Sequence, residues 1–389
     1  MIRRLLTLAV ALILAVLVVR NAAVDALADR NPDAAARIWP GHPTAQLSLA
    51  LTEIGRAARE RKAVPPAVFD LVDEAATKAP LAPEPFLVRG VQSQLVGNVR
   101  LAIADFEAAE FRDPRSLAAR YFLADAYFRT NDARHGLQEV LALSRLAPHG
   151  IDTVAPYVAT YAKDPATWPQ LREMFRADAN IEDASLTKLA SNVANADTVL
   201  ALADWDHVAA GSTWVPILVN SLVTAGQYDR ARALWARQWK VPLTASTTIF
   251  DADFTESKAA TPFNWELVSS TVGLAERQPG GRMHVIFYGQ EDGMLARQLL
   301  VLRPGNYRLT IRVSGDPART KSLHWSVRCD KKDAPLGAIG LDAISARGLT
   351  FTVPADCPAQ WVELGGTSGD ISHQVDATIE GVKLEAVNG

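Results

Sequence analysis

The stretch that decides the fold covers residues 83–150 and divides into two consecutive segments of equal length. Residues 83–116 read PEPFLVRGVQSQLVGNVRLAIADFEAAEFRDPRS, and residues 117–150 read LAARYFLADAYFRTNDARHGLQEVLALSRLAPHG. Pro80, Pro114 and Pro148 follow one another at this same interval. Apolar residues recur in both segments at helical spacing. A fixed period of this length indicates a repeated helix pair that buries its apolar face against its neighbours.

At the positions where helices would pack, both segments resemble tetratricopeptide repeats. The matching residues of the first segment are Phe86, Gly90, Ala102, Phe106 and Pro114, and those of the second are Leu123, Ala124, Tyr127 and Pro148. Arg89 and Ser93 depart from the pattern, and Gly136 replaces an alanine. Small residues let two helices approach closely, and large ones fill the gap between units. We therefore expect a bulky residue at Gly90 to separate a helix pair.

Residues 30–245 are expected to form one α-solenoid of such helix pairs. A degenerate copy ends at Pro80 and another runs over residues 214–242, while the register is lost over residues 151–207. The resemblance implies that one row of helices stays exposed as a platform for a protein partner. Arg120, Tyr121 and Arg129 are candidates for that surface. The alternative is that the aromatic residues fill the core and the arginines are merely solvated.

Residues 1–28 are expected to be a signal anchor or a signal peptide. An apolar run over residues 5–19, interrupted only by Thr7, follows Arg3 and Arg4 and stops at Arg20. The run is short for a spanning helix, but flanking arginines can reach the head groups. The alternative is cleavage after Ala26-Leu27-Ala28. The excess of arginine before the run favours a single-pass inner-membrane protein with its bulk in the periplasm.

Residues 247–389 are expected to form an antiparallel β-sandwich. Residues 307–313 and 324–329 alternate between apolar and polar side chains, as strands with one buried face do. Further strands are expected at residues 249–254, 264–268, 283–288, 295–302, 349–353, 361–364 and 375–386, with no helix among them. Nine or ten short strands favour a jelly roll. The predicted fold class is therefore multidomain α + β, with a transmembrane helix, a tetratricopeptide-like solenoid and a C-terminal sandwich.

The strand region also resembles sandwich modules of the carbohydrate-binding and galactose-binding type. The resemblance rests on residues 251–254, 263–265, 302–307 and 382–384, which read DADF, FNW, LRPGNY and VKL. It implies a binding face with exposed aromatic rings for a polysaccharide. Trp361 is a candidate because it alternates with Val362 and Leu364, and Tyr288 is a second one. The alternative is that Trp361 packs at an edge or between sheets, and Trp265 is expected in the core.

The two cysteines, Cys329 and Cys357, both lie in the strand region. In an exported domain they are expected to form a disulfide across 28 positions, because oxidising compartments favour such bonds. A zinc site and a nucleophilic cysteine are the weaker alternatives, since no histidine stands at ligand spacing and neither cysteine lies in a nucleophile motif.

Motifs that carry chemistry are missing from the sequence. The seven histidines are scattered singly, and there is no nucleophile elbow, phosphate loop or dinucleotide fingerprint. Asp251 and Asp253 are a weak calcium candidate. The formal charge of -3, from 43 acidic and 40 basic residues, argues against nucleic acid as a partner. We expect no catalytic residue, no metal and no cofactor.

The whole arrangement resembles membrane-anchored, periplasm-facing tetratricopeptide proteins of Gram-negative bacteria, some of which accompany exopolysaccharide synthesis and export. The resemblance implies a non-enzymatic scaffold for cell-envelope or exopolysaccharide assembly, held in the membrane through residues 5–19. One alternative is a glycan-binding module displayed on a helical spacer. A second is an exported glycoside-active enzyme.

Overall fold

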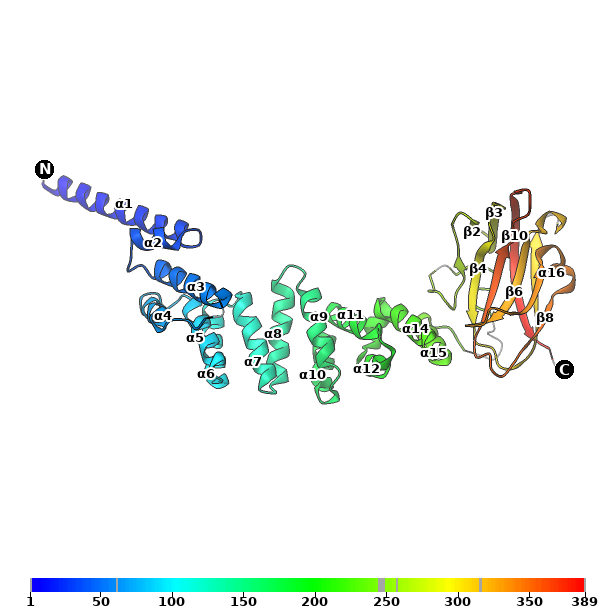
Figure 1. The fold of residues 1–389 in the computed structure, drawn as a ribbon, viewed down its shortest axis with the longest axis horizontal. Helices are drawn as coiled ribbons and strands as arrows, with labels where there is room; N and C mark the ends of the chain where they lie inside the picture. The colour runs from blue at the N-terminus through cyan, green and yellow to red at the C-terminus, as the bar shows by residue number, and fades with distance from the viewer. Residues whose placement is uncertain (1, 61, 244–248, 257, 315–316, 388–389) are drawn as a thin grey trace. The chain divides into compact units, whose positions relative to one another are not determined.

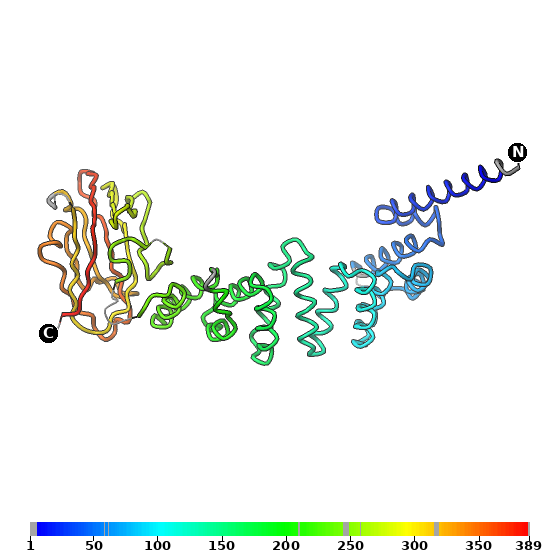
Figure 2. Tube along the Cα trace, turned by 180° about the vertical axis from the view of Figure 1, so that it is seen from behind, coloured from blue at the N-terminus to red at the C-terminus, as the bar shows by residue number. Residues whose placement is uncertain are grey.

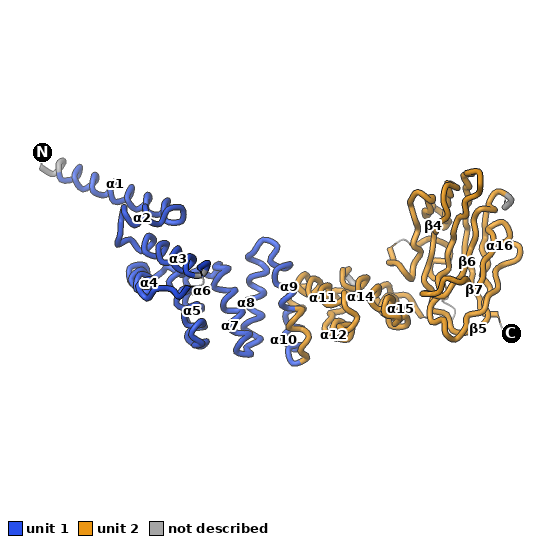
Figure 3. The backbone as a smooth tube through the Cα atoms, in the orientation of Figure 1, with its two compact units in different colours: residues 1–158, 166–174 blue, residues 159–165, 175–389 orange. Residues whose placement is uncertain are grey.

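A computed structural model describes residues 2–60, 62–243, 249–256, 258–314 and 317–387. The chain divides into two compact units, residues 1–158 with 166–174 and residues 159–165 with 175–389 (Figure 3). The expected fold class is confirmed: an N-terminal apolar helix, a series of paired helices and a two-sheet antiparallel region (Figure 1). The boundary expected at residues 245–247 lies outside the described residues, so the division into three domains stays a prediction.

The N-terminal helix α1 (Ile2–Ala28) continues well beyond the apolar run. Every residue from Leu6 to Val19 is exposed, whereas Val24 and Ala28 are buried. Val24 packs with Ala35 of α2 (Pro32–Ile38) and Ala45 of α3 (Pro43–Glu60). By length and composition, residues 6–28 could cross a membrane. The side chains of Arg3 and Arg4 lie outside the described residues.

Antiparallel helix pairs follow α3 in the first unit (Figure 2). Their helices are α4 (Pro66–Lys78), α5 (Glu84–Leu95), α6 (Val99–Arg112), α7 (Leu117–Arg129), α8 (Ala133–Leu146) and the start of α9 (Gly150–Tyr161). Asn98, Ser116 and Asp132 cap α6, α7 and α8 by accepting a backbone N–H with the side chain. Gly97 turns the chain between α5 and α6 with φ of +79°, a conformation that favours glycine.

Further helices continue the series into the second unit. They are α10 (Trp168–Ala177), α11 (Ala179–Ala190), α12 (Ala196–Leu202), α13 (Trp205–Ala210), α14 (Trp214–Thr224) and α15 (Tyr228–Trp239), with 3-10 turns at Pro165–Thr167 and Val193–Asn195. Glu182 of α11 is buried and holds the start of α13, because its carboxylate accepts the Asp204 backbone N–H at 2.6 Å and pairs with His207 Nδ1. This contact holds α13 against α11 in the part of the chain where the repeat register is lost.

Two five-stranded antiparallel sheets face each other at the C-terminal end. One has the order β1-β4-β9-β6-β7 and the other β2-β3-β10-β5-β8. The strands are β1 (Glu266–Leu267), β2 (Gly273–Gln278), β3 (Arg282–Phe287), β4 (Gly293–Leu300), β5 (Gly305–Ser314), β6 (Leu323–Cys329), β7 (Pro335–Gly340), β8 (Leu349–Val353), β9 (Gln360–Gly366) and β10 (Val375–Ala386). Their inward side chains, with Trp265 and Trp325 in contact, form one core, as expected for Trp265.

Two expectations about this region are wrong. Residues 249–254 form no strand, because Asp251 and Phe254 have φ of 50° and 56° and bend the chain. The strands β2 and β7 and the helix α16 (Leu341–Arg347) were not expected. Asp251, the weak calcium candidate, is fully buried; its Oδ2 lies 2.9 Å from Arg277 Nη2 and its Oδ1 accepts the Glu256 backbone N–H. Both oxygens that a cation would need therefore have partners within the chain.

Candidate functional site

The first helices of three successive pairs present side chains to a common exposed surface. On α7, Tyr121, Asp125 and Arg129 lie four residues apart and therefore share one helix face. Asp125 Oδ2 accepts hydrogen bonds from Gln94 Nε2 of α5 and from Arg129 Nε, both at 2.8 Å. Tyr157 of α9 lies close enough to Tyr121 to raise its pKa. We call these five residues the α5–α7–α9 surface.

Both tyrosines of this surface project into solvent. Tyr121 is 52% exposed and Tyr157 is 58% exposed. The electrostatic influence of Tyr157 raises the pKa of Tyr121, so its hydroxyl stays protonated near neutral pH. Tyrosine and arginine are common at the energetically important positions of protein interfaces. The surface can therefore offer apolar area together with donors and acceptors to a polypeptide.

Arg120 does not belong to this surface, contrary to expectation. Its side chain is only 14% exposed and its Nη1 lies 2.8 Å from carboxylate oxygens of both Glu110 and Glu139. Its Nε and Nη2 also donate to the Pro114 carbonyl. Burial raises the pKa of Glu139. Arg120 thus ties α6, α7 and α8 together, and only Tyr121 and Arg129 of the three candidates lie on the surface.

The residues proposed for repeat packing occupy two kinds of position. Ala102, Phe106, Leu123 and Ala124 are buried, and Phe86 and Tyr127 are half-buried. A Cβ added at Gly90 would lie 2.4 Å from the ring of Phe106, so the helices meet there without room for a methyl group. Pro114 and Pro148 are exposed and stand between helix pairs.

The outer face of the sheet β1-β4-β9-β6-β7 carries a polar groove, which we call the β4–β6–β9 groove. Its volume is about 300 Å³, and it is lined by Asp292, Gly293, Met294, His324, Ser326, Glu363, Gly365, Gly366 and Thr367. The strand register places Ser326 opposite Glu363 and His324 opposite Gly365. A Cβ at Gly365 would lie 3.1 Å from the His324 ring. Glycine at this position therefore keeps the floor of the groove open.

The charged groups of the groove are held by neighbours. Glu363 accepts two hydrogen bonds of 2.9 Å from the guanidinium of Arg328, and this pairing raises the pKa of Arg328. Asp292 accepts hydrogen bonds from the backbone N–H and the hydroxyl of Ser368, which lower its pKa. A general acid of a glycosidase needs the opposite shift. The lowered pKa of Asp292 therefore does not suit it to the role of general acid.

Trp361 lies on the same outer face, as its alternation predicted, but the expectation of an exposed ring is wrong. It is 8% exposed, the Arg297 guanidinium carbon lies 4.5 Å from its ring centroid, and its Nε1 donates to Asp330 at 2.9 Å. These neighbours leave no free face for a sugar ring. Tyr288, the second candidate, is 37% exposed, beyond the end of β3.

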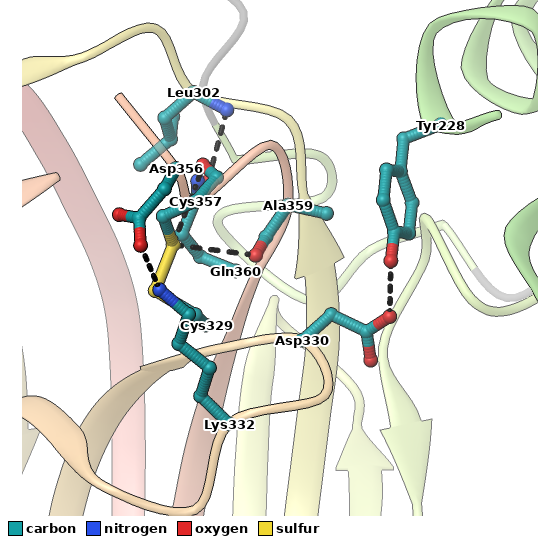
Figure 4. The surroundings of a disulfide bond; sticks show 9 residues. All are labelled: Tyr228, Leu302, Cys329, Asp330, Lys332, Asp356, Cys357, Ala359 and Gln360. Carbon is teal, nitrogen blue, oxygen red and sulfur yellow. Dashed lines mark hydrogen bonds and ion pairs between the residues drawn. A yellow bond between two sulfur atoms is a disulfide. The ribbon is translucent and has the colours of Figure 1, made fainter. Parts of the chain in front are cut away.

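Cys329 and Cys357 form the disulfide expected from the sequence, with their Cα atoms 5.5 Å apart (Figure 4). The next residue, Asp330, joins the sandwich to α15, because its carboxylate accepts hydrogen bonds from Tyr228 of α15 at 2.5 Å and from Trp361. Trp235 Nε1 of α15 donates to the Ala260 carbonyl at 2.7 Å. The disulfide therefore holds the loop that α15 contacts.

The structure offers no metal cluster in the ranges it describes, meaning no group of three or more His, Cys, Asp or Glu side chains that could hold an ion. Sequence reasoning missed Gln94, Asp125 and Tyr157 of the α5–α7–α9 surface and every residue of the β4–β6–β9 groove. The four-residue spacing from Tyr121 through Asp125 to Arg129 was a usable signal for the first site. The β4–β6–β9 groove depends on the register between strands that are distant in sequence, so the sequence contained no usable signal for it.

No protein-family model and no curated protein matches this chain. Solved structures similar to it include tetratricopeptide-repeat proteins. PilF of Pseudomonas aeruginosa is 14% identical over 51% of this chain and 91% of PilF, with a TM-score of 0.28. MamA of Desulfovibrio magneticus RS-1 is 15% identical over 50% and 94%, with a TM-score of 0.24. YrrB, described as a TPR protein with an unusual peptide-binding site, is 11% identical over 44% and 91%, with a TM-score of 0.25.

Proposed function

We propose that this chain is a non-enzymatic scaffold of the cell envelope, anchored in the inner membrane by α1, with its bulk in the periplasm. The α5–α7–α9 surface is the docking site for a protein partner. The observation that carries the proposal is the convergence, from three successive helix pairs, of two exposed tyrosines and an exposed guanidinium with a half-buried carboxylate and a half-buried amide. An exposed polar and aromatic surface on a rigid helical array suits recognition of an extended polypeptide.

The anchor is supported by the exposed apolar surface of α1. Ten large apolar side chains from Leu6 to Val19 are each at least 41% exposed. Surface of this kind is stable in lipid and strongly unfavourable in water. Cleavage after Ala28 would also remove Val24 from its packing against Ala35 and Ala45, so we propose that the segment is retained.

Site-specific photocrosslinking in a Gram-negative host tests the docking site. A photoreactive phenylalanine replaces Tyr121 or Tyr157, and Leu101 of α6, which is 49% exposed, is the matched control on the second-helix row. We expect the same envelope protein, identified by mass spectrometry, in adducts from positions 121 and 157 and its absence at position 101. Equal adducts at all three positions would contradict the proposal.

A second function, glycan binding by the sandwich, is favoured by the β4–β6–β9 groove. We propose that the sandwich is a jelly roll, since β3-β10-β5-β8 against β4-β9-β6-β7 is the strand order of two interlocked Greek keys. The groove offers hydroxyl, imidazole and carboxylate groups that suit sugar hydroxyls. Electrophoresis through gels containing bacterial exopolysaccharide tests it. Retardation lost in His324→Ala and Ser326→Ala but kept in Tyr288→Ala supports the groove, and no retardation of the native chain refutes it.

A further inference from the structure

The apolar run of α1 is too short to cross the hydrocarbon layer by itself. Residues 5–19 are fifteen in number, which at 1.5 Å per residue gives about 22 Å against a layer of about 30 Å. A helix with this deficit draws its flanking residues toward the lipid. The residues around Arg20 therefore lie at the depth of the head groups.

Helix α2 runs back along α1 toward that depth (Figure 1). After the turn at residues 29–30, Ala35 packs on Val24, and the Ile38 carbonyl accepts a hydrogen bond of 3.0 Å from Arg20 Nε. The two helices are thus antiparallel, and Ile38 is level with Arg20. The next residues turn the chain away again into α3. The turn at residues 39–42 is therefore the part of the helical array that comes closest to the lipid.

The side chains of this turn suit a lipid interface. The Arg20 guanidinium carbon lies 4.5 Å from the Trp39 ring centroid, and the Trp39 and His42 rings are 5.0 Å apart. His42 Nε2 lies 2.9 Å from Asn21 Oδ1, which closes the belt of contacts around α1. Tryptophan and arginine are the side chains that favour the boundary between head groups and acyl chains.

An apolar groove lies directly on the lipid side of this belt. It has a volume of about 510 Å³ and is lined by Ala15, Val16, Val19, Arg20, Ala23 and Ile38. Ile38 is 36% exposed, and Val16 and Val19 are more than half exposed. The groove is continuous with the exposed apolar surface of α1. An occupant that covers both must be apolar and as extensive as the helix itself, which describes lipid acyl chains.

We propose that Arg20 and residues 38–42 form an interfacial collar that inserts into the lipid head-group layer around α1. This inference rests on the proposed membrane anchoring and adds a second contact with the lipid surface. Charge contributes little, because the basic residues over 20–42, Arg20, Arg30 and Arg37, are balanced by the acidic Asp25, Asp29 and Asp33. Insertion is therefore driven by apolar burial rather than by anionic lipid. The collar also fixes the orientation of the first helix pairs relative to the bilayer.

Fluorescence quenching in reconstituted vesicles tests the collar. Full-length Ile38→Cys and Gly41→Cys carry a bimane label, and Asp33→Cys, on the same helix but farther from the lipid, is the control. A Cβ at Gly41 meets only the end of Lys78, so that variant leaves the fold intact. The native cysteines are bonded to each other and stay unlabelled without reductant. The vesicles are phosphatidylcholine with a minor share of lipid that bears a nitroxide on its head group.

We expect quenching at positions 38 and 41 to be several-fold stronger than at position 33, and unchanged by high salt or by added phosphatidylglycerol. Equal quenching at all positions in a chain that resists carbonate extraction would overturn the collar while leaving the anchor intact. Labels at positions 38 and 41 that are shielded from aqueous quencher but not quenched by the lipid would overturn it too, and would assign the groove to a second protein copy. A soluble chain that begins at Asp29 would refute collar and anchor together.

Discussion

Replacing Gly90 by alanine tests the packing of α5 on α6 most sharply. The new Cβ would lie 2.4, 2.5 and 2.9 Å from three atoms of the Phe106 ring. That ring cannot yield, because it is fully buried and stacked on Phe122 at 5.1 Å between centroids. Overpacking of this kind costs about 1–3 kcal/mol, while alanine gains up to about 1 kcal/mol over glycine within a helix. We expect a net loss of about 1–2 kcal/mol.

Gly55→Ala is the matched control, because its Cβ in α3 would meet only the flexible end of Arg59 at 3.5 Å. That variant should gain up to about 1 kcal/mol. Hydrogen exchange with mass-spectrometric detection reports the local stability of each helix, and a tenfold change in rate corresponds to about 1.4 kcal/mol. We expect faster exchange in α5 and α6 of Gly90→Ala, and slower exchange in α3 of Gly55→Ala. In a Phe106→Leu background, Gly90→Ala should become neutral or stabilising. Slower exchange in Gly90→Ala alone would refute the packing argument.

Three further outcomes concern the second unit. Replacing Cys329 and Cys357 by alanine should cost the sandwich about 3–4 kcal/mol, read from urea unfolding by tryptophan fluorescence, and an unchanged midpoint would contradict this. Asp330→Ala leaves the buried Trp361 Nε1 unpaired and should lose about 1–3 kcal/mol, more than Tyr228→Phe, in hydrogen exchange of β9. The hydrogen bond with Glu182 raises the pKa of His207, so the stability of α11 and α13 should fall as the pH rises above 6.5, and His207→Gln should weaken that dependence. Burial raises the pKa of Glu182, which adds a fall of the same sign that begins above pH 4.5.

The helix pairs were predictable because their information is local and periodic. Equally spaced prolines mark the ends of units, and the small Gly90 opposite the large Phe106 marks a helix contact. Strands with clear alternation, such as β5 and β6, were predicted for the same reason. By contrast, β7 (PLGAIG) lacks alternation between apolar and polar residues. It is a strand because it pairs with β6, and this pairing could not be predicted from its own sequence.

The site residues depend on partners that are distant in sequence. The alternation of Trp361 placed it on the correct face, but its burial comes from Arg297 on β4 and from Asp330. A charged side chain such as Arg120 is expected at the surface, yet Glu110 and Glu139 from neighbouring helices enclose it. Neither set of contacts has a fixed sequence spacing, so single-sequence reasoning could not find it.

The intact mass of the protein in the membrane fraction tests the central claim most directly. The full chain is expressed in a Gram-negative host, the membranes are washed with carbonate, and the mass is measured with and without reductant. An anchored scaffold predicts a membrane-retained chain of 42.1 kDa with its disulfide formed. A soluble chain beginning at Asp29, or a cytoplasmic chain with free thiols, would contradict it.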